Sequence, residues 1–512
     1  MRNVKSLLAA AAAALCVITA PAQEPARRLS PSRSKAQRYI EAVSRNDILR
    51  NAAFGVLAIT EGGDTIASWN HDKRLIPASN MKLITTGAAM SELGPEFKFT
   101  TRIGHTGVVK DGVLEGDLYI IGGGDPTIAS KDSIAIPIND LFRQWKGFLD
   151  KAGIKRINGM VIGDGRYFDG LQDRDTWTYQ DIGTYYGSGV DGLCFYENTI
   201  DMKVTAGPTV GSPVSYMLSY PSLPWMKYYF DGRTGKAGTG DELYMYTSEF
   251  APYAEVRGTF AIDRKSRMEG FSNKFGAYTC AHYFREYLLA RGIVVNQGVA
   301  DVRLGRLRPD LNSFEPGPYA ARVDDLRILG MTYSPTLKKI VRETLLESDN
   351  FYAESLFKIL GRRLHHSSKP DSCVVAMNDA LRKLGAPADA IQIDDGSGLS
   401  RFNLVSPDYL VKFLSAMMDS PVFGDYIETM GQPGGRHYES RLQGEPAELK
   451  SRVHLKSGSM GGVRCFSGYI EPTEGSKSDA VVFSVMANNF IVPVSKVDPI
   501  IDRVIAMLAS EN

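Results

Sequence analysis

The sequence is poor in the residues that build disulfide frameworks and metal sites. It has five cysteines in 512 residues, and its seven histidines form neither an HExxH motif nor a Cys/His spacing suited to zinc. Beyond residue 22 four cysteines remain, 86 to 93 positions apart and without a CxxC motif: Cys194, Cys280, Cys373 and Cys465. This spacing excludes a disulfide framework and favours isolated buried thiols, although one or two bridges stay open in an exported chain. We expect no catalytic metal.

An excess of charge of either sign is also missing. The 59 Lys+Arg and 58 Asp+Glu give a formal net charge of +1, which argues against a dedicated nucleic-acid binder. Residues 187–192 match GxGxxG, but no helix pattern follows them and no βαβ unit surrounds them. We interpret that segment as a turn and expect no nucleotide or other cofactor.

No apolar run is long enough to span a membrane. Arg2 and Lys5 precede an almost wholly apolar stretch at 7–20, which is shorter than the roughly 20 residues of a spanning helix. Small residues at 20–22 suit signal peptidase, so residues 1–22 are predicted to be a cleaved secretory signal. Lipid attachment at Cys16 is a minor alternative. We expect an exported protein without a transmembrane anchor.

Hydrophobic periodicity predicts sheet and helix at both ends of the chain. The predicted strands there are 52–60, 64–70, 465–470 and 480–486. The predicted helices are 34–47, one starting near Ser79, 336–346, 351–360, 373–384, 407–418 and 495–509. The region between them is glycine-rich and strand-like, apart from a helix at 137–152.

The simplest topology for this order is one α/β domain that an insert interrupts. We assign the domain to residues 23–96 and 323–512, and the β-rich insert to 97–322. Within the insert, residues 207–262 are dense in Tyr, Pro and Gly and are a possible sub-domain.

Three short motifs follow one another in the order found in serine acyl enzymes that recognise penicillin. They are Ser79-Asn80-Met81-Lys82 (SxxK), Ser348-Asp349-Asn350 (SxN) and Lys456-Ser457-Gly458 (KSG). Chance matches to SxxK occur at Ser32 and Ser355, and to SxN at Ser44 and Ser68. Only Ser79 opens a strongly apolar helix, and K[ST]G occurs once, so one combination meets the order.

The SxxK spacing has a chemical reason. Residues three apart share a helix face, so Ser79 and Lys82 project together within hydrogen-bond reach. A lysine can take the serine proton only if burial or a second cation lowers its pKa, and Lys456 is the obvious second cation. We therefore expect Ser79 as nucleophile, a neutral Lys82 as base, and a charged Lys456 that holds a substrate carboxylate.

The remaining motif residues complete this hypothesis. Ser348 would relay a proton to the leaving amine, and Asn350 would bind a substrate amide and orient Lys82. The backbone N–H groups of Ser79 and Ser459 would form the oxyanion hole.

Longer segments carry a resemblance to a known family. Residues 77–85, 93–97, 116–127, 348–350 and 395–401 together resemble the class C low-molecular-mass penicillin-binding proteins, which are D-alanyl-D-alanine carboxypeptidases and endopeptidases. The resemblance implies a β-lactamase-like α+β transpeptidase domain, an antiparallel sheet flanked by helices, that a two-part insert interrupts. It further implies a periplasmic enzyme that acts on peptidoglycan stem peptides and is acylated by β-lactam antibiotics.

The resemblance also implies substrate-binding residues. Ser457 and Gly458 of the KSG motif would bind substrate, while Asp164, Phe168 and Arg401 would contact the distal end of the peptide's third residue. The segments 165–167 and 434–437 depart from the family pattern, which leaves fine specificity open.

Two other functions remain open at this stage. A β-lactamase shares the acyl-enzyme step, but the sequence has no ExxLN segment to supply the class A deacylation base. A non-catalytic wall-binding protein of the same fold is disfavoured because all the motif residues are intact. An oligomer is possible.

Overall fold

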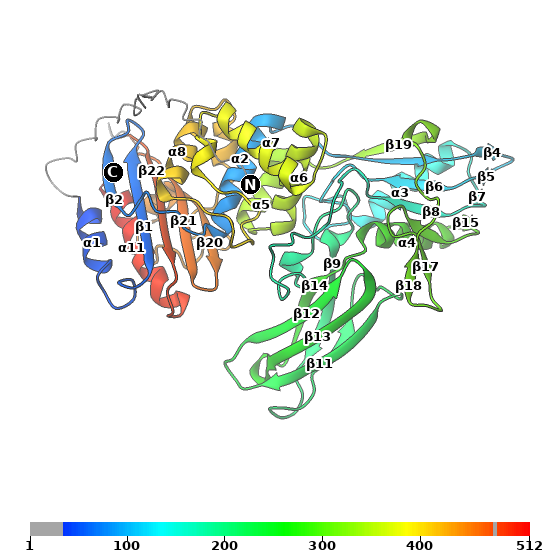
Figure 1. Ribbon diagram of the computed structural model, residues 1–512, viewed down its shortest axis with the longest axis horizontal. Coiled ribbons are helices and arrows are strands. Elements are labelled where there is room, and N and C mark those ends of the chain that lie inside the picture. The colour runs from blue at the N-terminus through cyan, green and yellow to red at the C-terminus, as the bar shows by residue number, and fades with distance from the viewer. Residues whose placement is uncertain (1–33, 475–478, 512) are drawn as a thin grey trace, which may run out of the picture.

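A five-stranded antiparallel sheet joins the two ends of the chain (Figure 1), in the order β2-β1-β22-β21-β20. The computed structural model describes residues 34–474 and 479–511, so the predicted signal at 1–22 lies outside the described residues. The strands are β1 (Ala53–Thr60), β2 (Thr65–Trp69), β20 (Val453–Met460), β21 (Val463–Ile470) and β22 (Val481–Asn488).

Helices cover both faces of this sheet. On the central strand β22, Phe483 and Val485 pack in one core with α1 (Lys35–Val43) and α11 (Val494–Ser510). Val482 and Met486 alternate with them and pack in a second core on the opposite face. Because successive strand residues point to opposite faces, β22 is buried along its whole length.

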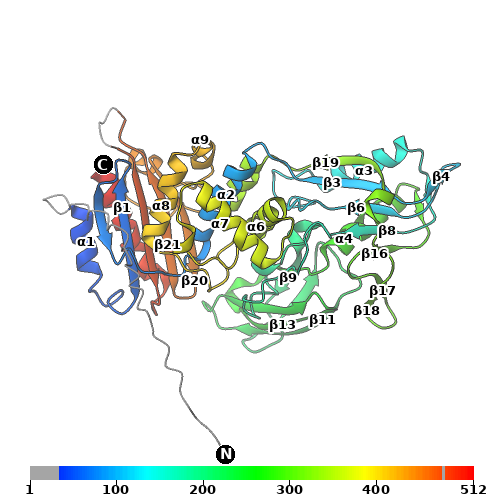
Figure 2. The same ribbon diagram turned by 45° about the horizontal axis from the view of Figure 1, so that its top comes forward.

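The second face carries the helices that hold the motifs. They are α2 (Met81–Leu93), α5 (Leu337–Leu346), α6 (Asn350–His365), α7 (Pro370–Lys383), α8 (Pro407–Met418) and the short α9 (Phe423–Ile427). The short helix α10 (Ala447–Ser451) instead adds Leu449 to the core of the first face, with α1 and α11. Helix α2 is buried on all sides over its first ten residues, as an apolar helix in the centre of a domain must be. Figures 1 and 2 both show α6 between the sheet and the insert.

The insert contains a five-stranded mixed sheet in the order β16-β8-β6-β3-β19, and a smaller sheet in the order β15-β7-β5-β4. Its strands are β3 (Thr100–His105), β4 (Val108–Lys110), β5 (Val113–Glu115), β6 (Leu118–Ile121), β7 (Arg156–Ile157), β8 (Val161–Asp164), β15 (Val294–Val295), β16 (Val299–Asp301), the hairpin β17 (Arg306–Arg308) with β18 (Ser313–Glu315), and β19 (Arg327–Tyr333). Helices α3 (Ile138–Lys151) and α4 (Gly276–Leu289) share a core with these sheets.

Two three-stranded sheets form a lobe below the rest of the insert in Figure 1, in the orders β10-β9-β14 and β11-β13-β12. The strands are β9 (Thr199–Thr205), β10 (Ser215–Leu218), β11 (Lys227–Gly235), β12 (Asp241–Ser248), β13 (Ala251–Ala261) and β14 (Ser266–Ser272). They begin before and end after the sub-domain expected at 207–262. We propose to set its limits at β9 and β14.

The predicted fold class is confirmed, and the helices and strands predicted at both ends lie close to the observed ones. The prediction missed several elements, among them α4, β20 and the short helices α9 and α10. Helix α4 contains Gly, Thr, Cys and five aromatic or His side chains, which are weak helix formers that tertiary burial overrides. Strand β20 carries the KSG motif itself, where the prediction placed strands only after it.

Two smaller expectations are also met. The four described cysteines are buried and free of disulfides. Residues 188–192 run as irregular backbone, and a short 3-10 turn and strand β9, not an α-helix, follow them. Among residues 34–474 and 479–511, no helix is both long and apolar enough to cross a membrane.

Candidate active site

A cavity of about 430 Å³ lies where the three motifs meet. Four of the residues predicted for catalysis line it: Ser79, Ser348, Asn350 and Ser459. Arg401 lines it too, with tyrosines of the insert opposite.

Ser79 sits in a single 3-10 turn, Ala78–Asn80, that opens α2. Strand β20 lies so close to this turn that a Cβ on Gly458 would be 2.5 Å from the carbonyl oxygen of Pro77. The amide of Asn80 donates to Ser467 on β21 at 2.7 Å, which ties the turn to the sheet. The glycine of KSG is therefore needed for close approach. Ser79 is only partly buried.

Lys82 lies one helical turn further on and is fully buried. Its Nζ donates to Ser79 Oγ at 3.1 Å, to Asn350 Oδ1 at 2.5 Å and to the carbonyl oxygen of Ser397 at 2.8 Å. Burial lowers the pKa of Lys82 to about 8, although the nearby carboxylates of Asp349, Asp395 and Glu354 oppose the shift. The expected Ser–Lys contact is present.

The carbonyl that faces Lys82 belongs to a turn held by two buried carboxylates. Glu354 accepts from the N–H groups of Gly396 and Ser397, and Asp395 accepts from those of Gly398 and Ser400. Because all these donors are main-chain groups, the conformation of the turn does not depend on side chains at the surface.

Lys456, on β20, reaches the second motif from the other side. Its Nζ donates to Ser348 Oγ at 2.9 Å. Burial lowers the pKa of Lys456 well below the ordinary lysine value, and the charges of Lys82 and Arg464 lower it further, with no carboxylate among the causes. Burial thus lowers the pKa of both lysines, but carboxylates that oppose the shift lie near Lys82 alone of the two.

The backbone is strained at Ser348 and directly before Ser79. Ser348 has φ of 58°, and Ala78, directly before Ser79, has φ of 45°. Residues other than glycine rarely adopt this left-handed region, and such strain clusters at functional sites where surrounding packing enforces it.

Asn350 connects the site to the insert. Its amide Nδ2 donates to the carbonyl oxygen of Tyr186 at 2.9 Å, which fixes the orientation that turns Oδ1 toward Lys82. Asp349, the N-cap of α6, accepts from Tyr352 N at 2.7 Å and holds the start of this helix.

Buried cations hold the insert segment that contains Tyr186. Lys358 of α6 donates to the carbonyl oxygens of Leu171 and Val190 at 2.8 and 2.7 Å. Lys274 pairs with Asp173 at 2.7 Å and donates to the carbonyl oxygen of Gly187. Burial lowers the pKa of both lysines, and the nearby carboxylates raise it.

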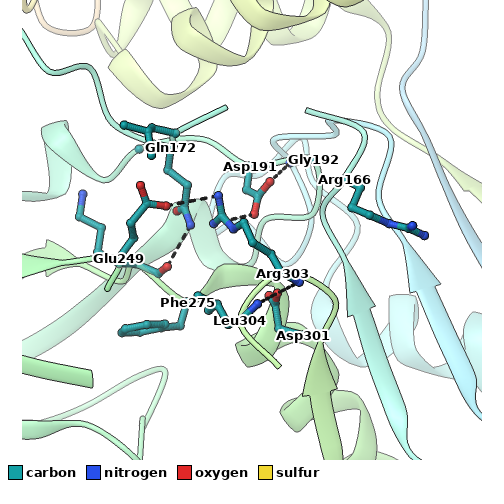
Figure 3. A network of polar contacts seen from close by, with 12 residues as sticks. Arg166, Gln172, Asp191, Gly192, Glu249, Phe275, Asp301, Arg303 and Leu304 are labelled. Atoms are coloured by element: carbon teal, nitrogen blue, oxygen red, sulfur yellow. Dashed lines mark hydrogen bonds and ion pairs between the residues drawn. The ribbon is translucent and has the colours of Figure 1, made fainter. Parts of the chain in front are cut away.

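Arg303 completes this support. Figure 3 shows its guanidinium between the carboxylates of Asp191 and Glu249, with distances of 3.2 and 3.3 Å. Because these groups lie in the insert and Lys358 lies on α6, the segment is fixed from both sides.

Two residues that the resemblance placed at the substrate are not part of the lining of this cavity. Asp164 is buried and forms a two-pronged ion pair with Arg166, at 2.9 and 2.7 Å, while Phe168 packs in the hydrophobic core against Gly124. Neither lines the cavity. Arg401 does line it, and its guanidinium donates to the carbonyl oxygen of Gly461 at 3.2 Å.

Sequence reasoning missed several residues of the site. Tyr438 receives a hydrogen bond from Ser457 N at 3.2 Å and lies 3.3 Å from Ser457 Oγ, so it supports the KSG strand. The carbonyls of Ser397 and Tyr186 carry no side-chain signal, and only the Asp-Gly-Ser-Gly turn pattern pointed to the first. Glu354, inside an ordinary helix pattern, gave no sign of its role.

The sheet, the covering helices and the Ser–Lys pair facing a second serine and lysine define a penicillin-recognising serine acyl enzyme. A model of the D-Ala-D-Ala carboxypeptidase 3 (S13) family matches residues 36–509, and the chain belongs to this family. The predicted family and the predicted serine-type D-Ala-D-Ala carboxypeptidase are thereby confirmed.

Individual relatives agree with this assignment. The chain is 27% identical over 479 residues to a D-alanyl-D-alanine carboxypeptidase of Actinomadura sp., which spans 89% of this chain and 81% of that protein. It is 24% identical over 433 residues to the D-alanyl-D-alanine carboxypeptidase DacB of Haemophilus influenzae, which spans 82% of each. The crystal structure of penicillin-binding protein 4 from Haemophilus influenzae has the same fold, with a TM-score of 0.74 at 20% identity over 93% of this chain and 99% of that chain.

Proposed function

We propose that Ser79 attacks the carbonyl carbon of the penultimate D-alanine of a peptidoglycan stem peptide. A C–O bond to Ser79 forms while the C–N bond to the last D-alanine, or to the amine of a cross-link, breaks. Ser348 passes a proton to the leaving nitrogen, and water then hydrolyses the ester and regenerates Ser79. The observation that carries this proposal is the 3.1 Å contact of Ser79 with a buried lysine whose pKa is lowered.

The environments of the two lysines suggest how Lys82 loses its proton and becomes available as a base. In the empty site, the carboxylates near Lys82 favour the proton there, while Lys456 has no acidic partner. A substrate carboxylate beside Lys456 supplies the missing negative charge and raises its proton affinity. We therefore propose that binding transfers the proton from Lys82 to Lys456, so that Lys82 accepts the Ser79 proton only when substrate is present.

The cavity supports the remaining roles. The N–H groups of Ser79 and Ser459 form the oxyanion hole, and Arg401 receives the distal part of the substrate. β-Lactams carry the same carboxylate next to a reactive carbonyl, so they acylate Ser79. The predicted signal at 1–22 and a substrate in the cell wall together support a periplasmic location.

Labelling with a fluorescent penicillin tests this function. We expect a stable adduct that peptide mapping places on Ser79, and none in Ser79→Ala. Ser355→Ala is a matched control, because Ser355 also lies in an SxxK match but is buried in α6 with its hydroxyl bonded to the Phe351 carbonyl oxygen. Labelled Ser79→Ala protein would refute the nucleophile, and rapid consumption of antibiotic without an adduct would identify a β-lactamase.

A further inference from the structure

A second hollow of about 190 Å³ on the insert shares lining residues with the active-site cavity. Tyr185 and Tyr186 line both of them. The far wall of the hollow is formed by β12 and β14, and Tyr244 of β12 is part of it. A ligand that extends out of the cavity on this side therefore meets the lobe next.

The segment that carries these tyrosines is fastened to the lobe. Thr184 pairs with Phe271 of β14, and Ser272 N donates to the carbonyl oxygen of Gly183 at 3.0 Å. A Cβ on Gly183 would lie 1.5 Å from the carbonyl oxygen of Met245 on β12, so only glycine permits this approach. The lobe and the active site thus hold the two tyrosines from opposite sides, since Asn350 bonds the carbonyl of Tyr186.

Beyond the hollow, the outer face of the sheet β11-β13-β12 is rich in exposed tyrosine. Tyr246 of β12 and Tyr229 of β11 both pair in register with Glu255 of β13, so the three share one face. Tyr229 is 54% exposed. Tyr179, from the loop before Tyr185, is 68% exposed and contacts Tyr246 in a tilted arrangement, with ring centroids 5.1 Å apart and an interplanar angle of 33°. Figure 1 shows β12, β13 and β11 following one another away from the rest of the molecule.

The chemistry of these tyrosines favours a neutral sugar chain as the ligand. Tyrosine rings offer a rigid apolar surface with a polar edge, which suits the flat apolar faces and hydroxyl groups of sugar rings. The hollow is lined by the acids Asp241 and Glu269 and by no basic side chain, so a ligand rich in carboxylates is disfavoured. Sugar hydroxyl and acetamido N–H groups can donate to such acids.

We propose that the track, defined as Tyr185, Tyr186, Tyr244, Tyr246 and Tyr179, binds the amino-sugar glycan strand of the peptidoglycan whose stem peptide occupies the active site. The inference rests on the proposed function, because that function places a stem peptide in the adjoining cavity. The track lets the enzyme engage polymeric wall rather than free peptide alone.

The test compares two substrates. The double variant Tyr179→Ala/Tyr246→Ala removes the two contacting rings from the outer face. Because this removes part of the proposed glycan-binding surface, we expect kcat/KM on polymeric peptidoglycan to fall about tenfold. Hydrolysis of a free stem pentapeptide should stay unchanged. Tyr333→Ala is the matched control, because Tyr333 is 55% exposed on β19 and lines neither hollow nor cavity.

A binding measurement separates this inference from the proposed function. In the Ser79→Ala background, the protein should co-sediment with insoluble chitin, an uncharged N-acetyl amino-sugar polymer without stem peptides, and the double variant should lose this binding. Equal activity of wild type and double variant on polymeric peptidoglycan, or binding of free stem peptides but not of chitin, would overturn the inference. Failure of the wild type on free pentapeptide would instead contradict the proposed function and leave the glycan-binding result to be judged separately.

Discussion

Asp349→Asn should make acylation faster at neutral pH. The side chain of Asp349 is the largest electrostatic cause that holds a proton on Lys82. Its own pKa is raised by burial to about 6, so the carboxylate is mostly charged at pH 7. Asparagine keeps the N-cap hydrogen bond of α6 but removes the negative charge. The pKa of Lys82 must then fall, because its protonated form loses an opposite charge.

The magnitude follows from the pKa of Lys82. At a pKa of about 8, roughly one Lys82 in ten is neutral at pH 7. Losing one neighbouring charge lowers that pKa by about 1, to about 7, and makes roughly half of the lysines neutral. Acylation should therefore accelerate about fivefold at pH 7. This factor applies where Lys82 loses its proton to solvent. Transfer to Lys456 depends on the difference between the two lysine pKa values, and a lower pKa of Lys82 favours that transfer too.

Stopped-flow acylation by a fluorescent penicillin, measured from pH 5 to pH 9, checks this result. The ratio of variant to wild type should approach one at pH 9, where Lys82 is already neutral, and at pH 5, where Asp349 is itself protonated. Asp181→Asn serves as control, because Asp181 lines the same cavity but is not among the charges acting on Lys82. A ratio of one or less at pH 7 would refute the reasoning.

Three further predictions concern the supports of the site. Gly458→Ala should slow acylation at least tenfold, because its Cβ would force β20 away from Pro77, while Gly461→Ala, whose Cβ would meet only the Arg401 guanidinium at 3.4 Å, should acylate normally; equal rates would contradict this. Lys358→Met should lower the free energy of unfolding by about 3 kcal/mol in urea titrations, since buried carbonyls lose their donor, and an unchanged midpoint would count against it. Asp164→Asn should leave kcat/KM on stem peptide within about twofold while Arg401→Met raises KM, and the reverse outcome would restore Asp164 to the substrate site.

The sequence carried enough information to predict the contact between Ser79 and Lys82. An SxxK match that opens an apolar helix places its two side chains on one face, and helical geometry alone then requires the observed contact. The interrupted domain followed from sheet and helix patterns at both chain ends. These are local rules, in which residues a few positions apart decide the outcome.

The missed features depend on pairs far apart in the chain. Lys456 and Lys82 are separated by 374 positions, and the balance of their proton affinities depends on which carboxylates tertiary packing brings near each one. The carbonyl of Tyr186 is a main-chain group, so no residue type in the sequence indicates that it accepts a hydrogen bond from Asn350. The ion pair of Asp164 with Arg166 is a local exception, since the family pattern that drew attention to Asp164 did not predict it.

The placement of β22 between β1 and β21 determines when the enzyme can become active. Phe54 pairs with Ala487, so the central sheet closes only after almost the whole chain is available. Pairing over such a separation is entropically expensive and slow, whereas the insert and the helices between 335 and 420 make mostly nearer contacts. In an incompletely synthesised chain, the strand that carries Lys456 is therefore not yet in its final position. The active site is complete, and the peptidase can act, only after the last strands have joined the sheet.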